Sequence, residues 1–117
     1  MKKDSVIRMK SMDFAIRIIK LRRFLQNAKE FDLSSQVARS GTAIGALIRE
    51  AEYAESKADF IHKMRIALKE ANETSYWLEL LYKVEILADN IYNSIKADNE
   101  ELKKMLLCII NTSIKSV

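Results

Sequence analysis

The chain has 117 residues, of which 49% are apolar and 31% charged, and its formal net charge is +4. This length suits one domain spanning residues 1–117, and this balance argues against a disordered or membrane-embedded chain. No apolar run approaches the roughly 20 residues that span a bilayer, and no secretory signal is visible, so we expect a reduced, cytoplasmic setting. The absence of proline and the presence of only two glycines predict long helices.

The first predicted helix runs from about Ser5 to Ala28 and carries most of the positive charge. Residues 1–29 hold nine basic and two acidic side chains, a net charge of +7, whereas the remaining 88 residues carry −3. Apolar residues cover more than half of the circumference, which predicts contact with more than one neighbour. They form two adjoining stripes, namely Met12, Ala15, Ile16 and Ile19, and Phe14, Ile18, Leu21 and Leu25.

Basic side chains presented along a helix can follow a phosphate backbone and gain affinity from counterion release. An equally good interpretation is that they keep an otherwise apolar helix in solution. The candidates for phosphate contacts are Lys10, Arg17, Lys20, Arg22 and Arg23.

The second predicted helix follows a connection at residues 31–33 and runs to about Tyr53, with Ser34 or Ser35 as its N-cap. Its small residues include Gly41 and Gly45. Close approach of a neighbouring helix is favoured over a kink at this point, although glycine weakens a helix by about 1 kcal/mol relative to alanine.

The third predicted helix, about Lys57 to Leu87, begins at Ser56, which caps it together with Asp59. Its core residues alternate steps of four and three, as in the seam of a bundle: Phe60, Met64, Ala67, Ala71, Thr74, Leu78 and Leu81. The adjacent residues Tyr76 and Trp77 point to different faces, so at least one should lie away from the bundle centre. A subunit interface and a peripheral core position remain two interpretations of that aromatic pair.

The fourth predicted helix has Asp89 as a possible cap, but Asp98 and Asn99 interrupt its apolar face and leave open a start at Asp98. Cys108 lies in an apolar run and is interpreted as a small buried hydrophobe rather than a reactive thiol. The three short links predict antiparallel neighbours. The fold class is therefore all-α, an antiparallel up-down-up-down four-helix bundle.

Catalytic and metal chemistry find little support in the sequence. The chain has a single histidine, His62, and a single cysteine, too few for a zinc site or a di-iron pair, and it has no phosphate-binding glycine loop. Glu70 and Glu73 lie beside the seam, and pairing with Arg39 or Arg65 is favoured over an acid–base role. We expect no metal, no cofactor and no enzymatic activity.

Residues 36–81 resemble a known family. The residues that carry the resemblance are Gln36, Arg39, Ser40, Thr42, Ile44, Gly45, Ala46, Arg49, Glu50, Ala51, Ser56, Asp59, Phe60, Lys63, residues 66–70, Glu73, Thr74 and residues 76–78. This pattern resembles the four-helix bundle family of 23S rRNA-intervening sequence proteins, also called S23. The chain departs from the family pattern at Ala43 and Leu47, where the family often has serine and asparagine, so no polar role is carried over to those two positions.

The resemblance implies a homo-oligomer, the barrel-shaped pentamer of related accessory proteins of diversity-generating retroelements, which bind nucleic acid and a reverse transcriptase. Arg39, Glu50, Glu70 and Glu73 match family positions and suit a buried ion-pair network that fixes the bundle or its subunit contacts. Two functions follow as hypotheses. The first is association with RNA or DNA through the basic first helix, and the second is a protein-interaction scaffold or accessory subunit that works through apolar surface at Leu47, Tyr76 and Trp77.

Overall fold

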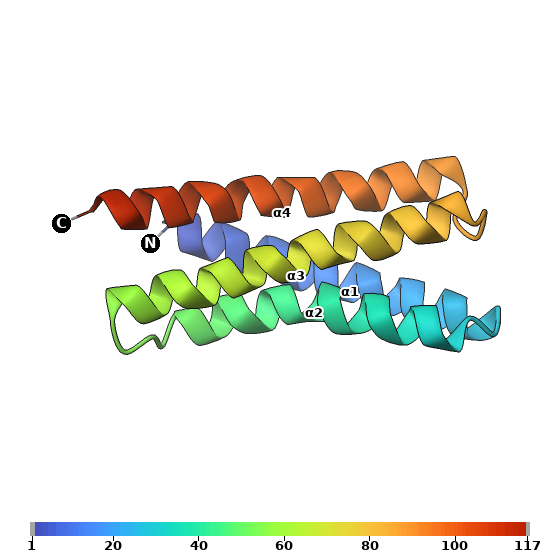
Figure 1. The fold of residues 1–117 in the computed structure, drawn as a ribbon, viewed down its shortest axis with the longest axis horizontal. Coiled ribbons are helices and arrows are strands. Elements are labelled where there is room, and N and C mark those ends of the chain that lie inside the picture. Colours follow the sequence, from blue (N-terminus) through green and yellow to red (C-terminus); the bar gives the residue numbers. More distant parts are fainter. Residues whose placement is uncertain (1, 117) are drawn as a thin grey trace.

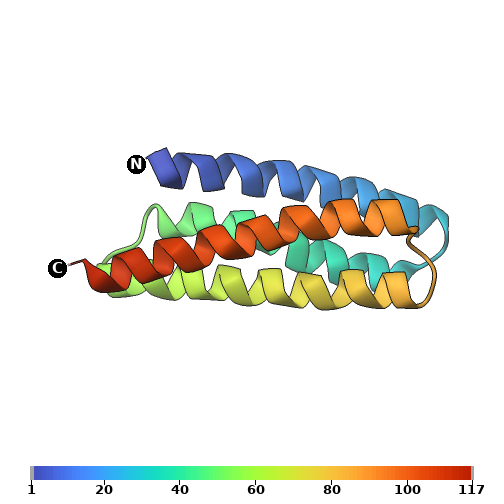
Figure 2. The same cartoon turned by 90° about the horizontal axis from the view of Figure 1, so that it is seen from above.

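Four long helices follow one another along the chain (Figure 1). The computed structural model describes residues 2–116, with side chains from residue 6 onward. The helices are α1 (Lys2–Asn27), α2 (Phe31–Ala51), α3 (Lys57–Lys83) and α4 (Asp89–Lys115). Each runs antiparallel to the one before it, and both ends of the chain lie at the same end of the bundle (Figures 1 and 2). The predicted all-α, up-down-up-down four-helix bundle is confirmed.

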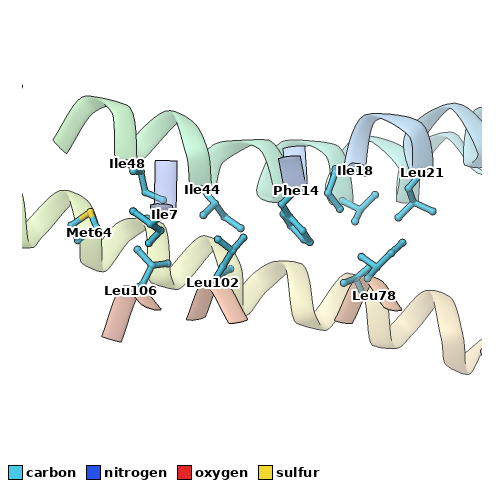
Figure 3. Close-up of a cluster of buried hydrophobic side chains, with 14 of the residues drawn as sticks. Ile7, Phe14, Ile18, Leu21, Ile44, Ile48, Met64, Leu78, Leu102 and Leu106 are labelled. Carbon is cyan, nitrogen blue, oxygen red and sulfur yellow. The ribbon is translucent and has the colours of Figure 1, made fainter. Parts of the chain in front are cut away.

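All four helices contribute to one apolar core along the bundle axis (Figure 3). The predicted seam of α3 is buried from Met64 to Leu81, while Phe60 at its start is partly buried. The labelled side chains of Figure 3 point toward one another from all four helices: Ile7, Phe14, Ile18, Leu21, Ile44, Ile48, Met64, Leu78, Leu102 and Leu106.

The first connection is shorter than predicted, because α2 begins at Phe31 rather than after Ser34 or Ser35. Ser34 is buried inside the first turn, and its hydroxyl donates to the carbonyl of Phe31 at 2.8 Å, so it does not cap the helix. The chain reverses at Lys29, whose φ of 64° is left-handed, and the amide of Glu30 donates back to the carbonyl of Leu25 at 2.8 Å. Helices often end in this way at a glycine in the left-handed conformation, and here that residue is a lysine.

The ends of α3 test two further predictions. Ser56 caps the helix as predicted, since its hydroxyl accepts from the amide of Asp59 at 3.0 Å. The helix stops at Lys83 instead of Leu87, because Glu85 takes a φ of 65° and the amide of Ile86 donates to the carbonyl of Leu81 at 2.9 Å.

Helix α4 is continuous from Asp89, so a start at Asp98 is wrong, and Asp89 does not act as a side-chain cap. Asn99 interrupts the apolar pattern without ending the helix, because its buried amide nitrogen donates to the carbonyl of Ala71 at 2.9 Å and to the hydroxyl of Ser75 at 2.8 Å. Asn99, the polar residue that breaks the apolar pattern, therefore makes a contact between α4 and α3.

Cys108 is exposed, which corrects the expectation of a buried residue.

Helices α1 and α2 approach closely through small residues. A Cβ atom placed on Gly41 would lie 2.8 Å from Cγ1 and 2.9 Å from Cγ2 of Ile18, a side chain that is fully buried. A Cβ atom on Gly45 would lie 3.3 Å from the hydroxyl of Ser11, and Ser11 is itself buried. Close packing, rather than a kink, explains both glycines, since α2 runs unbroken past them.

Candidate nucleic-acid interface

The five basic residues predicted to contact phosphates are all on α1, but the structure divides them into two groups. Lys10 and Arg17 face α4, where Lys10 pairs with Glu101 at 2.8 Å and Arg17 pairs with Asp98 at 2.8 Å. Arg17 also donates to the hydroxyl of Ser94 at 2.7 Å. These two cations therefore hold α1 to α4, and a phosphate would have to compete with a carboxylate for each of them.

The second group is Lys20, Arg22 and Arg23, which lie on the C-terminal half of α1 and are exposed. Within residues 6–116, none of these three forms an ion pair. Residues three apart on a helix are surface neighbours, so Lys20 and Arg23 share one face. This short stretch is the part of the predicted basic surface that can accept a phosphate without breaking an existing contact.

The pairing of Lys10 also affects its protonation. The hydrogen bond to Glu101 and the negative charge of that carboxylate raise the pKa of Lys10 above its ordinary value of 10.5. The carboxylates of Asp98 and Asp13 act in the same direction with smaller effects. Lys10 therefore stays charged throughout the physiological range, with much of its field cancelled by acidic neighbours.

Three of the four predicted network residues come together between α2 and α3. The guanidinium of Arg39 donates to Glu70 at 3.3 Å and also contacts Glu73, whose carboxylate accepts from the indole nitrogen of Trp77 at 3.1 Å. Glu50 lies apart, where it pairs with Lys63 at 3.6 Å. The cluster is not buried as expected, because the Arg39 side chain is 50% exposed. A half-exposed pair is screened by water, so losing one partner costs far less than stranding a buried charge.

The predicted interface residues occupy different environments. Tyr76 is 59% exposed, while Trp77 and Leu47 are partly buried and pack against the core. The two aromatic rings meet edge to face, with centroids 5.0 Å apart. As the sequence predicted, the neighbouring aromatics of α3 point to different faces, and Tyr76 is the one that reaches the surface.

Sequence reasoning missed how much apolar surface α1 leaves exposed. The stripe containing Phe14, Ile18, Leu21 and Leu25 is buried, but Met9, Met12 and Ile16 are 66%, 45% and 47% exposed. Met12 and Ala15 of α1 line a groove of about 250 Å³ with Gly45 and Ala46 of α2. The signal was present in the other apolar stripe, Met12, Ala15, Ile16 and Ile19, whose members are exposed or only partly buried.

The structure brings no set of metal-binding residues together. Among the described residues, no three His, Cys, Asp or Glu side chains lie close enough to hold a metal ion. His62 is exposed on α3, and Glu70 and Glu73 face Arg39. Over the same part of the chain, none of the helices has a stretch that is long and apolar enough to cross a membrane.

A helical bundle with one basic helix and apolar side chains on its surface is typical of binding and assembly proteins. The chain belongs to the family of 23S rRNA-intervening sequence proteins, because the family model matches residues 3–108. It is also similar to a protein of unknown function from the S23 ribosomal protein family of Bacteroides thetaiotaomicron VPI-5482, with 55% identity and a TM-score of 0.91. That match covers 93% of this chain and 98% of the other. Among curated proteins, no match is found.

Proposed function

We infer that the protein is a non-enzymatic homo-oligomer that associates with RNA or DNA through α1. The observation that carries this proposal is the group Lys20, Arg22 and Arg23, which is exposed and unpaired within the described part of the chain. Contacts from Lys and Arg to phosphate oxygens carry no sequence information, so the proposed binding is independent of sequence. Repetition of this group in an oligomer would multiply its field.

The two groups of cations should contribute unequally to binding. Each phosphate neutralised by Lys20, Arg22 or Arg23 releases condensed counterions, which makes affinity fall with salt. Lys10 and Arg17 must first leave Glu101 and Asp98, so their net contribution is smaller. We therefore assign most of the proposed phosphate contacts to the C-terminal half of α1.

The test is fluorescence anisotropy of labelled single-stranded RNA and duplex DNA, titrated with protein at several salt concentrations. We expect binding that weakens log-linearly with salt. Reversing Lys20 and Arg23 to glutamate should flatten the log–log slope by about two units. The matched control reverses Lys69 and Lys104, which are exposed on α3 and α4 and unpaired within residues 6–116. The proposed phosphate contacts would be contradicted by a slope that changes equally in both variants, or by the absence of binding at low salt.

Self-association is supported by the exposed apolar stripe on α1. Met9, Met12 and Ile16 lie one turn apart and continue into the groove beside Ala46 of α2. Contiguous exposed apolar surface marks an interaction site more often than isolated apolar residues do. Burying this stripe against a second copy would remove it from water, and the family resemblance implies that five copies assemble.

The oligomer is tested by sedimentation velocity of the wild type and of the double variant Met12→Glu, Ile16→Glu. We expect the wild type to sediment as one species several times the 13.5 kDa chain mass, and the variant to sediment as a helical monomer. Leu107→Glu is the matched control, because Leu107 is equally exposed but lies on α4. A wild-type monomer would refute self-association, and an oligomer that survives the double variant would place the interface elsewhere.

A protein-interaction scaffold is the second candidate, and the exposure of Tyr76 favours it. A tyrosine held edge to face against Trp77 offers a rigid amphipathic contact, a residue type enriched in protein interfaces. The resemblance to retroelement accessory proteins suggests a reverse transcriptase as the partner. Binding to a purified reverse transcriptase that survives high salt and is lost in Tyr76→Ala would favour this function over phosphate binding.

A further inference from the structure

A second apolar groove, of about 500 Å³, lies between the C-terminal half of α1 and the start of α4. Its floor is made by Leu21, Leu87 and Ile95, which are buried. Its two edges carry Phe24, 53% exposed, and Ile91, 43% exposed. The groove is thus a concave surface whose two edges carry large, solvent-exposed apolar side chains.

The dimensions of this groove suit a helix. Its walls span residues 17–24 of α1 and 86–95 of the α3–α4 connection and α4. At 1.5 Å per residue, the α1 wall is roughly 10 Å long, or two helical turns. A helix that lies in a groove of this length presents apolar side chains at positions i, i+3 or i+4, and i+7.

The charges at the rim select the kind of helix. Arg17 and Lys20 line the α1 side, and among the described residues no acidic side chain lines the groove. Asp98 offsets the charge of Arg17, but Lys20 has no ion-pair partner within the described residues, and Arg23 lies one turn further along. At the other end, Glu85 and Asp89 are next in sequence to the lining residues Ile86 and Ala88, and Asp89 accepts a hydrogen bond from Tyr82. The α1 edge of the groove therefore favours a negatively charged ligand.

We propose that this groove docks a short amphipathic helix of a partner protein, with apolar anchors against Phe24 and Ile91 and a carboxylate against Lys20. Lys20 and the exposed ring of Phe24 also suit a nucleic acid, but its phosphates and bases gain little from the aliphatic floor and from Ile91. Both requirements of the groove, apolar anchors and an acidic flank, are met by about two turns of acidic amphipathic helix. This proposal does not depend on nucleic-acid association.

The experiment is a selection from a displayed library of 16-residue helical peptides against the full chain, with the double variant Phe24→Ser, Ile91→Ser as counter-target. These substitutions remove apolar surface and leave the charge unchanged, and both sites are half-exposed, so the bundle should fold. We expect selected peptides to carry apolar residues at i, i+3 or i+4, and i+7 with flanking Asp or Glu. Binding, measured by anisotropy, should weaken about tenfold or more in the double variant, as expected for an interface anchor.

A charge exchange tests the electrostatic part separately. Lys20→Glu should weaken the selected acidic peptides and improve copies in which their acidic residues are replaced by lysine. Lys104→Glu, at an exposed lysine of α4 that does not line the groove, is the matched control and should bind like wild type. The proposal is overturned if no peptide is enriched, if enriched peptides lack acidic residues, or if binding survives loss of Phe24 and Ile91.

Two further outcomes would assign the groove to another occupant. If the Phe24→Ser, Ile91→Ser variant loses its oligomeric state in sedimentation, a second copy of the chain fills the groove. If the same variant loses RNA affinity in parallel with peptide affinity, the groove belongs to the nucleic-acid surface. The phosphate proposal alone fails if Lys20→Glu and Arg23→Glu change peptide binding but leave RNA binding unchanged.

Discussion

Helix α1 packs against α2 on one side and against α4 on the other, and the two contacts have different chemistry. Toward α2, the backbones approach over Gly41 and Gly45, and buried Ile18 fills the space above Gly41. Toward α4, the helices pack less closely, with the ion pairs of Lys10 and Arg17 at the rim and an open groove beyond them. Packing shape specifies the first contact, whereas charge and solvent-exposed surface characterise the second. The paired cations and the groove beside Lys20 lie on the second side, whereas the exposed apolar stripe at Met12 borders α2.

The largest effect is expected from overfilling the close contact. Gly41→Leu places a branched side chain where even a Cβ atom would lie 2.8 Å from Ile18. We expect the free energy of unfolding to fall by about 2–3 kcal/mol, because overpacking outweighs the roughly 1 kcal/mol gained when glycine leaves a helix. Chemical denaturation monitored by circular dichroism measures the change.

Gly45→Ala is the matched control for this substitution. Its Cβ atom would meet the hydroxyl of Ser11 at 3.3 Å, a contact that needs a shift of only a few tenths of an ångström. The gain in helix propensity should offset that shift and leave stability within about 1 kcal/mol of wild type. Equal destabilisation by both variants would mean that the contact depends on glycine flexibility rather than on the shape of Ile18.

The contrast also shows what the sequence could and could not predict. The α3 seam was predicted because its spacing is periodic, and the glycines of α2 were correctly assigned to close packing. The position of Asp98 and Asn99 was misjudged because their partners, Arg17 and Ala71, lie on other helices. The residue pattern within one helix shows which face of that helix is apolar. A polar side chain that bonds to another helix looks, in that pattern, like an interruption.

Two other errors have the same origin. Ser34 resembles a cap in sequence but bonds inside the first turn of α2, and the reversal at Lys29 uses a left-handed conformation that lysine does not signal. For the candidate site, composition located the basic helix but not which cations are paired. Pairing depends on the rotation of α1 relative to α4, which no local pattern records.

A smaller effect is expected on the α4 side. Lys10→Ala and Arg17→Ala remove ion pairs whose side chains are 42% and 34% exposed. Each should lower the free energy of unfolding far less than Gly41→Leu does, since solvent screens such pairs. The loss should shrink further in high salt, whereas the effect of Gly41→Leu should not. Denaturation curves at two ionic strengths separate the two contacts.

Hydrogen exchange gives this prediction a local measurement. Without Lys10 and Arg17, amides in the first half of α1 should exchange faster, because that part of the helix loses its polar attachment to α4. Amides of α2 beside Gly41 should keep their protection. Uniform acceleration across the bundle would show that both contacts open together as one cooperative unit.

The smallest expected effect is a dependence on alkaline pH that belongs to the α4 side alone. The pKa of Lys10 is raised by its hydrogen bond to Glu101, so the stabilising contribution of this pair is fully present below about 10.5 and is lost as pH rises through the folded-state value. Tyr82 acts in the same window, since the hydrogen bond to Asp89 raises the pKa of its phenol above 10.0. Tyr82→Phe is therefore the background in which Lys10 should be studied.

In that background, an NMR titration of the lysine Cε signals should show Lys10 releasing its proton at lower pH in Glu101→Gln than in the parent. The methyl signals of Ile18 should stay unchanged over the same range, because the α2 contact contains no titrating group between Ile18 and Gly41. Coincident titration of Lys10 with and without Glu101 would show that the pair is absent in solution. In that case the N-terminal half of α1 would offer Lys10 to phosphate as freely as Lys20, and the division of the basic helix into paired and unpaired cations would fall.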